Sequence, residues 1–495
     1  MGSSYFSNLI YNKSEPILFT SGFFLLIFTL FILIYSFVYK RKSFRTVYVV
    51  LFSLYFYYKT SGDFVIVLLG SIVVNYIIAL VIDVADSKRL KLFTFIYGIL
   101  INIISLAYFK YINFIIDNIN IILSGKIHNI DIIFPIGISF YTFQSISYLT
   151  DVYRENIKPA DKITDYAFYV SFFPYIIAGP IVRASDLLPQ NSEKLIIRKE
   201  DVDTGFYLIV RGLIKKGIFS YYISQYCDLI YGAPANFSGL ENLIAMLGYT
   251  VDIYLDFSGY SDIAIGLAGI MGFRLKPNFN SPYKSKNLTE FWKRWHISLS
   301  TWLRDYLFLP LTYFYLRHSK NKKISLLNSY IFATMITMFI AGLWHGPSYK
   351  YIFWGTIHGL GLTVNRTYLY FTKKKIRKIL IPDLLGKLIT LTFVSVAWVF
   401  FRANSFDDAF ISLHSILFNF DIAYLMPFYD ARSLFSILFI VSIILIFSPE
   451  YLKQKVQFLV SESPVYVKAV IFIIILQILI QIQTESIQPF IYYQF

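Results

Sequence analysis

Apolar runs long enough to cross a lipid bilayer recur from one end of the chain to the other, and nothing else constrains the fold as strongly. A helix needs about 20 apolar residues to cross the hydrocarbon core. Four such runs are Ile17–Tyr39, Phe64–Ile82, Leu92–Phe109 and Val465–Ile482. Hydrophobic residues make up 56% of the 495 residues and charged residues only 15%, whereas soluble domains carry roughly 25% charge. We therefore predict an all-α polytopic integral membrane protein.

The spacing of these runs predicts about 11–13 membrane helices or re-entrant elements in one domain over residues 1–495. N-terminal helices are expected within residues 17–109, a core within about 130–402 and C-terminal helices within 409–495. The polar stretch Lys110–Asp131 is predicted to be an external loop. The hydroxyl-rich run Phe134–Arg154 is typical of a helix that faces protein or a cavity. Two prolines and a glycine interrupt Tyr166–Pro180, which favours a re-entrant element.

The positive charges lie in clusters between the apolar runs. The formal net charge is +15, and the clusters lie at Lys40–Arg45, Lys88–Lys91, Lys215–Lys216, Arg317–Lys323 and Lys373–Lys378. This distribution is typical of cytoplasmic loops and does not indicate nucleic-acid binding. Thr60–Asp63 lacks cations, so we expect it to be external, with the N-terminus outside the cytoplasm. The first apolar run is too long for a cleavable signal peptide.

The densest mixture of cations and tryptophans is the stretch Asn278–Pro310, which contains His296. Trp292, Trp295, Leu299 and Trp302 recur at spacings of three and four between Glu290 and Tyr306, so we predict one helix there with an apolar face. A basic amphipathic helix of this kind also suits the membrane interface. His296 falls on the apolar side of the helix, and the interfacial interpretation does not require it.

A second polar cluster ends an apolar segment at AGLWHGP, residues Ala341–Pro347, and carries His345. The break His-Gly-Pro places His345 at a helix end. Gly355 and Gly359 have the small-xxx-small spacing of closely packed membrane helices. We therefore interpret His358, which lies between them, as a packed core histidine.

A histidine in a membrane protein is suited to general-base catalysis, because it can take a proton from a hydroxyl near neutral pH. A hydroxyl activated in this way attacks a thioester to give an ester, through an intermediate that needs hydrogen-bond donors. The histidine spacing predicts no metal site, and the single cysteine, Cys227, excludes a cysteine zinc site and an internal disulfide. The residues alone leave open a transporter or a purely structural role.

Polar side chains also gather in the apolar region Glu241–Met271. Asp252, Asp256 and Asp262 lie there beside Tyr254. They are either paired contacts between helices or the lining of a polar tunnel. The candidates for tunnel lining are Trp344, Trp292, Trp295, Ser298, Asp256, Tyr254, Lys293 and Arg294.

Five sequence blocks resemble the membrane-bound O-acyltransferase family, and most closely its bacterial alginate O-acetylation branch. They are PIGISFYTFQSISYLTDVYR (Pro135–Arg154), AGPIVR (Ala178–Arg183), NFNSPYKSKNLTEFWKRWHISLSTWLRDYLFLPL (Asn278–Leu311), AGLWHGP (Ala341–Pro347) and PFIYYQF (Pro489–Phe495). The resemblance implies a ring of tilted helices around a central tunnel, with His345 as the catalytic residue and His296 as its polar partner. The segment Thr312–Lys323 departs from the branch, which usually has a short glycine-rich turn there.

The same resemblance implies an enzyme that moves an acetyl group from a cytoplasmic thioester donor to a cell-surface polysaccharide. The donor would be acetyl-CoA, another acyl-CoA or an acyl-carrier protein, and no bound cofactor is expected. The expected location is the bacterial inner membrane, with a periplasmic or extracytoplasmic acetyltransferase as partner protein. Within the family, the alternatives are D-alanyl transfer to teichoic acid and peptidoglycan O-acetylation. Outside the family, a transporter needs paired halves, and the chain shows no internal repeat.

Overall fold

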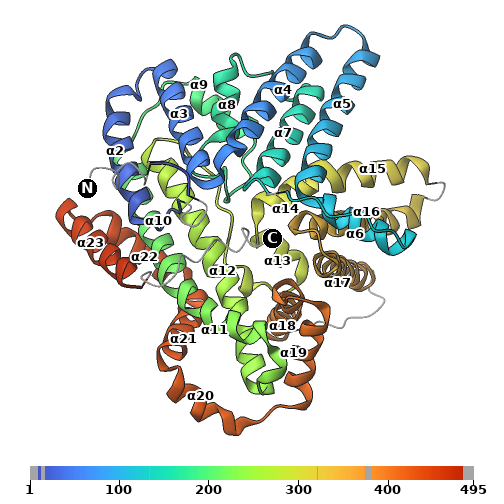
Figure 1. Cartoon of the computed structure of the whole chain (residues 1–495), viewed down its shortest axis with the longest axis vertical. Helices are drawn as coiled ribbons and strands as arrows, with labels where there is room; N and C mark the ends of the chain where they lie inside the picture. The colour runs from blue at the N-terminus through green and yellow to red at the C-terminus, as the bar shows by residue number, and fades with distance from the viewer. Residues whose placement is uncertain (1–8, 13–16, 133, 320–321, 374–381, 483–495) are drawn as a thin grey trace. The chain divides into compact units, whose positions relative to one another are not determined.

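The computed structural model describes residues 9–12, 17–132, 134–319, 322–373 and 382–482. The described residues form α-helices with short π-helical and 3-10 segments and no strands, as Figure 1 shows. The block Pro489–Phe495 and nearly all of the basic cluster Lys373–Lys378 lie outside the described residues.

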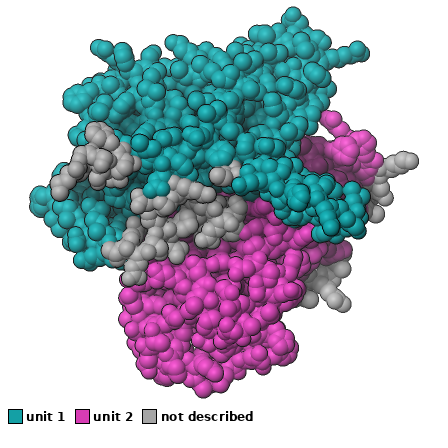
Figure 2. All heavy atoms as spheres, in the orientation of Figure 1, with its two compact units in different colours: residues 1–213, 260–276, 457–489 teal, residues 214–259, 277–456, 490–495 magenta. Residues whose placement is uncertain are grey.

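The chain divides into two compact units, which Figure 2 shows in different colours. Unit 1 comprises residues 1–213, 260–276 and 457–489, and unit 2 comprises residues 214–259, 277–456 and 490–495. Helices α12 (Gly239–Ile270) and α22 (Glu450–Ser461) contribute residues to both units. The prediction of one domain over 1–495, and that of a ring around a tunnel, stay predictions.

The first unit is built mainly from the N-terminal helices. They are α2 (Gly22–Val38), α3 (Lys42–Ser61), α4 (Val65–Val84), α5 (Lys88–Leu106), α6 (Ile112–Leu123), α7 (Ile138–Tyr153), α8 (Ile163–Ser171), α9 (Ala184–Ser192) and α10 (Lys199–Leu213), followed much later by α23 (Val465–Ile482). Helix α7 packs against α4 and α5, and its Gln144 and Ser145 are fully buried. The hydroxyl-rich run therefore faces protein rather than lipid.

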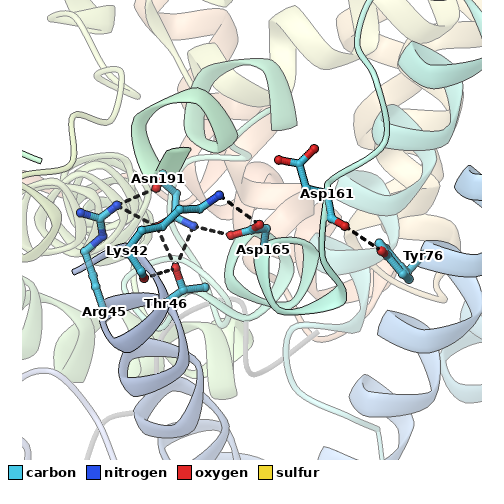
Figure 3. A network of polar contacts seen from close by, with 7 residues as sticks. All are labelled: Lys42, Arg45, Thr46, Tyr76, Asp161, Asp165 and Asn191. Atoms are coloured by element: carbon cyan, nitrogen blue, oxygen red, sulfur yellow. Dashed lines mark hydrogen bonds and ion pairs between the residues drawn. The ribbon is translucent and has the colours of Figure 1, made fainter. Parts of the chain in front are cut away.

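Arg45 ties three helices of this unit together. It was expected in a basic loop, but its side chain is buried and donates to the backbone oxygens of Tyr39 and Asn191 at 3.0 and 2.6 Å. The Asn191 side chain in turn donates to Asp165 at 2.9 Å. Figure 3 shows this network, in which Lys42 also pairs with Asp165 at 3.3 Å. It joins the start of α3 to α8 and α9, because a buried guanidinium needs acceptors for its donors.

The predicted external loop Lys110–Asp131 is wrong over its first half. The chain continues through a π-helical segment, Ala107–Tyr111, into α6. Asn118 donates to the backbone oxygen one turn back at 2.7 Å, and Asn120 exchanges hydrogen bonds of 2.8 and 2.9 Å with the backbone of Ile127 beyond the helix. These asparagines made the stretch look like a loop, whereas they satisfy backbone groups of the helix and of the segment that follows it.

The second unit contains the stretch that the sequence singled out. Its helices are α11 (Tyr221–Gly232), most of α12, α13 (Leu288–Arg294), α14 (Ile297–Leu303), α15 (Leu309–His318), α16 (Lys322–His345), α17 (Tyr349–Lys373), α18 (Asp383–Arg402), α19 (Phe406–Phe418), α20 (Leu425–Ala431) and α21 (Ser433–Phe447). Two π-helical segments, Ile214–Ser220 and Arg304–Phe308, precede α11 and α15.

Several described helices have the length and apolarity to cross a membrane, which confirms the prediction of a polytopic all-α membrane protein. Five segments qualify, or up to seven if each of two bent helix pairs is one span. The five are Lys42–Val84, Lys88–Leu123, Leu326–His345, Asp383–Arg402 and Val465–Ile482.

Helices α16 and α17 pack along their lengths at glycines. A Cβ atom added at Gly342 would lie 2.2 Å from the backbone oxygen of Tyr351, and one added at Gly355 would lie 2.2 Å from that of Met338. Only glycine permits backbones to approach this closely. The contact brings the end of α16, at His345, against the first turns of α17.

Candidate active site

The single helix predicted over Glu290–Tyr306 is wrong, because the chain breaks at His296. Helix α13 ends at Arg294, Trp295 is extended, and His296 has φ +40° and ψ +57° before α14 begins. The backbone N–H of Asn280 donates to the Arg294 oxygen, and that of Ile297 donates to the Asn278 oxygen, both at 2.9 Å. The segment before α13 therefore satisfies backbone groups that a continuous helix would have paired internally.

The tautomer of His296 follows from its partners. The backbone N–H and the hydroxyl of Ser298 both donate to Asn278 Oδ1, at 3.1 and 2.8 Å, which identifies that atom as an acceptor. His296 Nδ1 lies 3.3 Å from the same oxygen, so in this pair it is the donor. The lone pair of the neutral ring is then on Nε2. That atom is buried and has no hydrogen-bond partner among the described residues.

His296 is neutral at physiological pH. It lies outside the five membrane-length segments, and burial lowers its pKa to about 3, because desolvation disfavours the charged imidazolium. Its ring meets Phe257 edge to face at 4.6 Å. A neutral ring with its lone pair on Nε2 can accept a hydrogen bond from a hydroxyl, and the lowered pKa makes it a weak base.

His345 is the last residue of α16 and is enclosed by aromatic rings. The ring centroids of Trp344, Trp354 and Phe401 lie 5.0, 5.0 and 5.1 Å from the imidazole. The last two rings come from α17 and α18. His345 is 4% exposed, so the neighbouring elements fix its place.

The structure brings the two histidine clusters to one indole. Trp344 lies 5.0 Å from the His345 ring and 6.3 Å from the His296 ring, centroid to centroid, with both imidazoles tilted steeply to the indole plane. His296 and His345 are separated by 48 intervening residues in the sequence, yet they are neighbours of the same side chain. Trp344 is therefore the tunnel candidate with the most direct link to both histidines.

A third histidine continues this aromatic cluster. His358 is fully buried on α17, and its Nδ1 accepts a hydrogen bond of 3.4 Å from Nε1 of Trp292. Its ring lies 4.8 Å from that of Trp354, which also contacts His345. The prediction that His358 is packed in the core is confirmed, and its location beside the catalytic candidates was not foreseen.

The remaining tunnel candidates of the α13–α14 region lie in three environments. Trp295 is buried in the aromatic core, with Trp398 and Phe291 at 5.1 and 5.6 Å. Ser298 belongs to the Asn278 hydrogen bonds described above. Arg294 pairs with Glu290 at 2.7 Å, and Lys293 is exposed. Lys293 therefore lies at the surface, whereas the three histidines of the cluster are buried.

The two candidates on α12 belong to a buried polar layer. Asp256 forms an ion pair with Lys216, and both side chains are buried. Tyr254 packs against Tyr283 at 5.5 Å and lies beneath the Lys215 ammonium at 5.7 Å. The assignment of Lys215 and Lys216 to a loop is wrong, because both lie in the helical segment Ile214–Ser220 and reach side chains of α12. Their assignment to the cytoplasmic side stays a prediction. Two adjacent lysines in the sequence are typical of a loop. The carboxylate partner of Lys216, Asp256, is identified only by the packing of α12.

Sequence reasoning missed Asn278 as a functional residue. It lies in the singled-out stretch but carries no charge or ring, so nothing marked it as more than a loop residue. No group of three or more His, Cys, Asp or Glu side chains that could hold a metal ion occurs within the described part of the chain.

The model of the membrane-bound O-acyltransferase family matches residues 162–406. This range includes all three histidines of the cluster. Among curated proteins, the chain is 34% identical to the peptidoglycan O-acetyltransferase of Helicobacter pylori over 397 residues, which is 75% of this chain and 73% of that protein.

Two other relatives are named for different acceptors, alginate and teichoic acid. The chain is 37% identical to the probable alginate O-acetylase AlgI of Pseudomonas aeruginosa over 387 residues, or 77% of this chain and 71% of that protein. It is 32% identical to the teichoic acid D-alanyltransferase of Bacillus subtilis over 279 residues, or 55% of this chain and 69% of that protein.

Proposed function

Because the chain belongs to the membrane-bound O-acyltransferase family and is an O-acyltransferase, we propose that it transfers acetyl groups to an alginate-like cell-surface polysaccharide. The observation that carries the proposal is the meeting of His296 and His345 at Trp344. The relatives named for alginate and peptidoglycan acetylation support an acetyl group and a glycan acceptor.

In the proposed reaction, His345 takes the proton of an acceptor hydroxyl as that oxygen attacks the thioester carbonyl. The C–O bond forms, the C–S bond breaks, and the proton passes from the imidazolium to the leaving thiolate. Base catalysis of this kind contributes about 10²–10⁴ in rate. His296 presents the Nε2 lone pair, which accepts a hydrogen bond from a second hydroxyl of the glycan and so orients the attacking hydroxyl toward the carbonyl carbon.

The donor is proposed to be acetyl-CoA or an acyl-carrier protein that approaches from the cytoplasm, with the acetyl group crossing the membrane through the protein. The protein would lie in the bacterial inner membrane with its N-terminus outside the cytoplasm. A periplasmic or extracytoplasmic acetyltransferase is the proposed partner protein. The basic clusters between the apolar runs support this orientation.

Purified protein in liposomes tests the proposal directly. Wild type and His345→Ala are given acetyl-CoA labelled in the acetyl group, and each supplied acceptor is assayed for label: deacetylated alginate, peptidoglycan fragments and lipoteichoic acid. We expect label on a glycan with wild type and at least a 10²-fold lower rate with His345→Ala. Undiminished transfer by correctly inserted His345→Ala would refute the catalytic assignment.

Peptidoglycan O-acetylation is the second candidate, because the relative named for it covers most of this chain. The same assay distinguishes the two, since label would then appear on peptidoglycan fragments rather than on alginate. Transfer of D-alanine from a carrier protein, with no transfer of acetyl, would favour the teichoic acid alternative.

A further inference from the structure

We infer that His358 is a positioning residue for the acyl-transfer site, which it serves by holding Trp292 and Trp354 in the places that fix the His345 ring. This inference rests on the proposed function, because it assigns His358 a role through His345. The evidence is a continuous series of contacts within unit 2, from α13 through α17 to the end of α16.

The first contact fixes the protonation of His358. Trp292 Nε1 is always a donor, so the Nδ1 atom that it meets at 3.4 Å must be the acceptor. The proton of the neutral ring is then on Nε2. That atom is buried and has no hydrogen-bond partner among the described residues. Phenylalanine would fill the same space without an unsatisfied polar atom. What His358 supplies here and phenylalanine cannot is therefore the Nδ1 acceptor for Trp292.

The second contact leads from His358 to His345. Trp354 lies one helical turn before His358 on α17, and the two rings meet at 4.8 Å with an interplanar angle of 62°. The Trp354 indole also meets the His345 ring, at 5.0 Å and 87°. Trp354 also lies 5.9 Å from Trp292. The histidine therefore anchors one tryptophan by a hydrogen bond and supports a second by ring packing, and the second tryptophan contacts His345.

This arrangement matters because catalysis depends on ring placement. Edge-to-face pairs restrict the angle between aromatic rings, and a misplacement of about 1 Å can cost 10²-fold in rate. A change at His358 is expected to act on kcat rather than on donor binding, since the described contact between His358 and the His345 ring runs through Trp354.

The test uses full-length protein in liposomes and compares substitutions at both ends of the hydrogen bond. We expect His358→Phe and Trp292→Phe each to lower kcat by roughly 10²-fold with an unchanged KM for acetyl-CoA. His358→Asn places an amide oxygen near the position of Nδ1 and should restore kcat to within a few-fold of wild type. The double variant should be no slower than either single variant, because one interaction has been removed from both sides.

Thr363→Val is the matched control, because Thr363 is a buried polar residue of α17 whose hydroxyl binds only the backbone oxygen of Leu360 among the contacts described. Its kcat should equal that of wild type. Wild-type kcat in folded His358→Phe, equal losses in His358→Phe and His358→Asn, or additive losses in the double variant would overturn the inference. If His358→Phe does not fold, Trp292→Phe tests the same bond. Undiminished transfer by folded His345→Ala would instead refute the catalytic assignment of the proposed function.

Discussion

At the residue scale, His296 both interrupts the helix and has a defined tautomer. Its positive φ is uncommon for a residue other than glycine, and it ends α13 where a helix was predicted. The same turn aims Nδ1 at Asn278 and leaves the lone pair on Nε2. The local conformation and the proposed chemistry thus depend on one side chain and on one asparagine 18 residues earlier.

Replacement of His296 by asparagine separates these two contributions. Asparagine tolerates the left-handed region better than most residues, so His296→Asn should keep the turn, but it lacks the ring and its Nε2 lone pair. We expect normal insertion and expression with acyl transfer reduced by about 10²-fold or more. The measurement is the initial rate of labelled acetyl transfer per folded molecule. An active, folded His296→Asn would show that the histidine only packs.

At the element scale, the α16–α17 pair supports the candidate site, because it carries His345, Trp354 and His358. The pair depends on the approach of backbones at Gly342 and Gly355. The spacing of Gly355 and Gly359 signalled this approach in the sequence. It did not signal Gly342, which lies in the AGLWHGP block and makes a contact as tight as that of Gly355.

Gly342→Ala should destabilise the α16–α17 pair and lower activity. The added Cβ would meet the Tyr351 backbone oxygen at 2.2 Å, so the helices must separate and His345 must shift relative to Trp354. We expect a lower apparent melting temperature in detergent and a kcat reduced by at least 10-fold, in line with the cost of small misplacements.

Gly70→Ala is the control for this substitution. Gly70 lies inside α4, and a Cβ atom there meets nothing within 4 Å. Since alanine favours a helix over glycine, this variant should be at least as stable as wild type and equally active. Equal stability of Gly342→Ala and Gly70→Ala would contradict the packing argument.

At the scale of the whole molecule, the orientation in the membrane stays a prediction that the charge distribution makes. The structure shows which loop positions are exposed enough for a labelling test of this orientation. Lys40, Lys88 and Asp63 are exposed, whereas Arg45 and Thr60 are buried. Cys227 is the only cysteine and is fully buried.

Single cysteines at Lys40, Lys88 and Asp63, in a Cys227→Ala background, should report the orientation. With a membrane-impermeant thiol reagent on intact cells, we expect labelling at Asp63→Cys alone, because basic loops stay in the cytoplasm. Permeabilised cells serve as the control and should give labelling at all three positions. Labelling of Lys40→Cys or Lys88→Cys from outside would reverse the orientation.

The sequence by itself determined the membrane class, the helix α23 to the residue and the two histidine clusters. Each of these depends on local composition or on the pattern of apolar residues, which a single stretch of chain displays. Tertiary structure decided the rest. No glycine or proline marks the helix break at His296 in the sequence. The break is possible because the backbone groups of Arg294 and Ile297 pair with those of Asn280 and Asn278. The burial of Arg45 and Lys216 likewise depends on partners from distant helices. Long-range hydrogen bonds and ion pairs offset the free-energy cost of breaking the helix and of burying these charges. The partner groups come from distant parts of the chain, so the local sequence pattern cannot predict them.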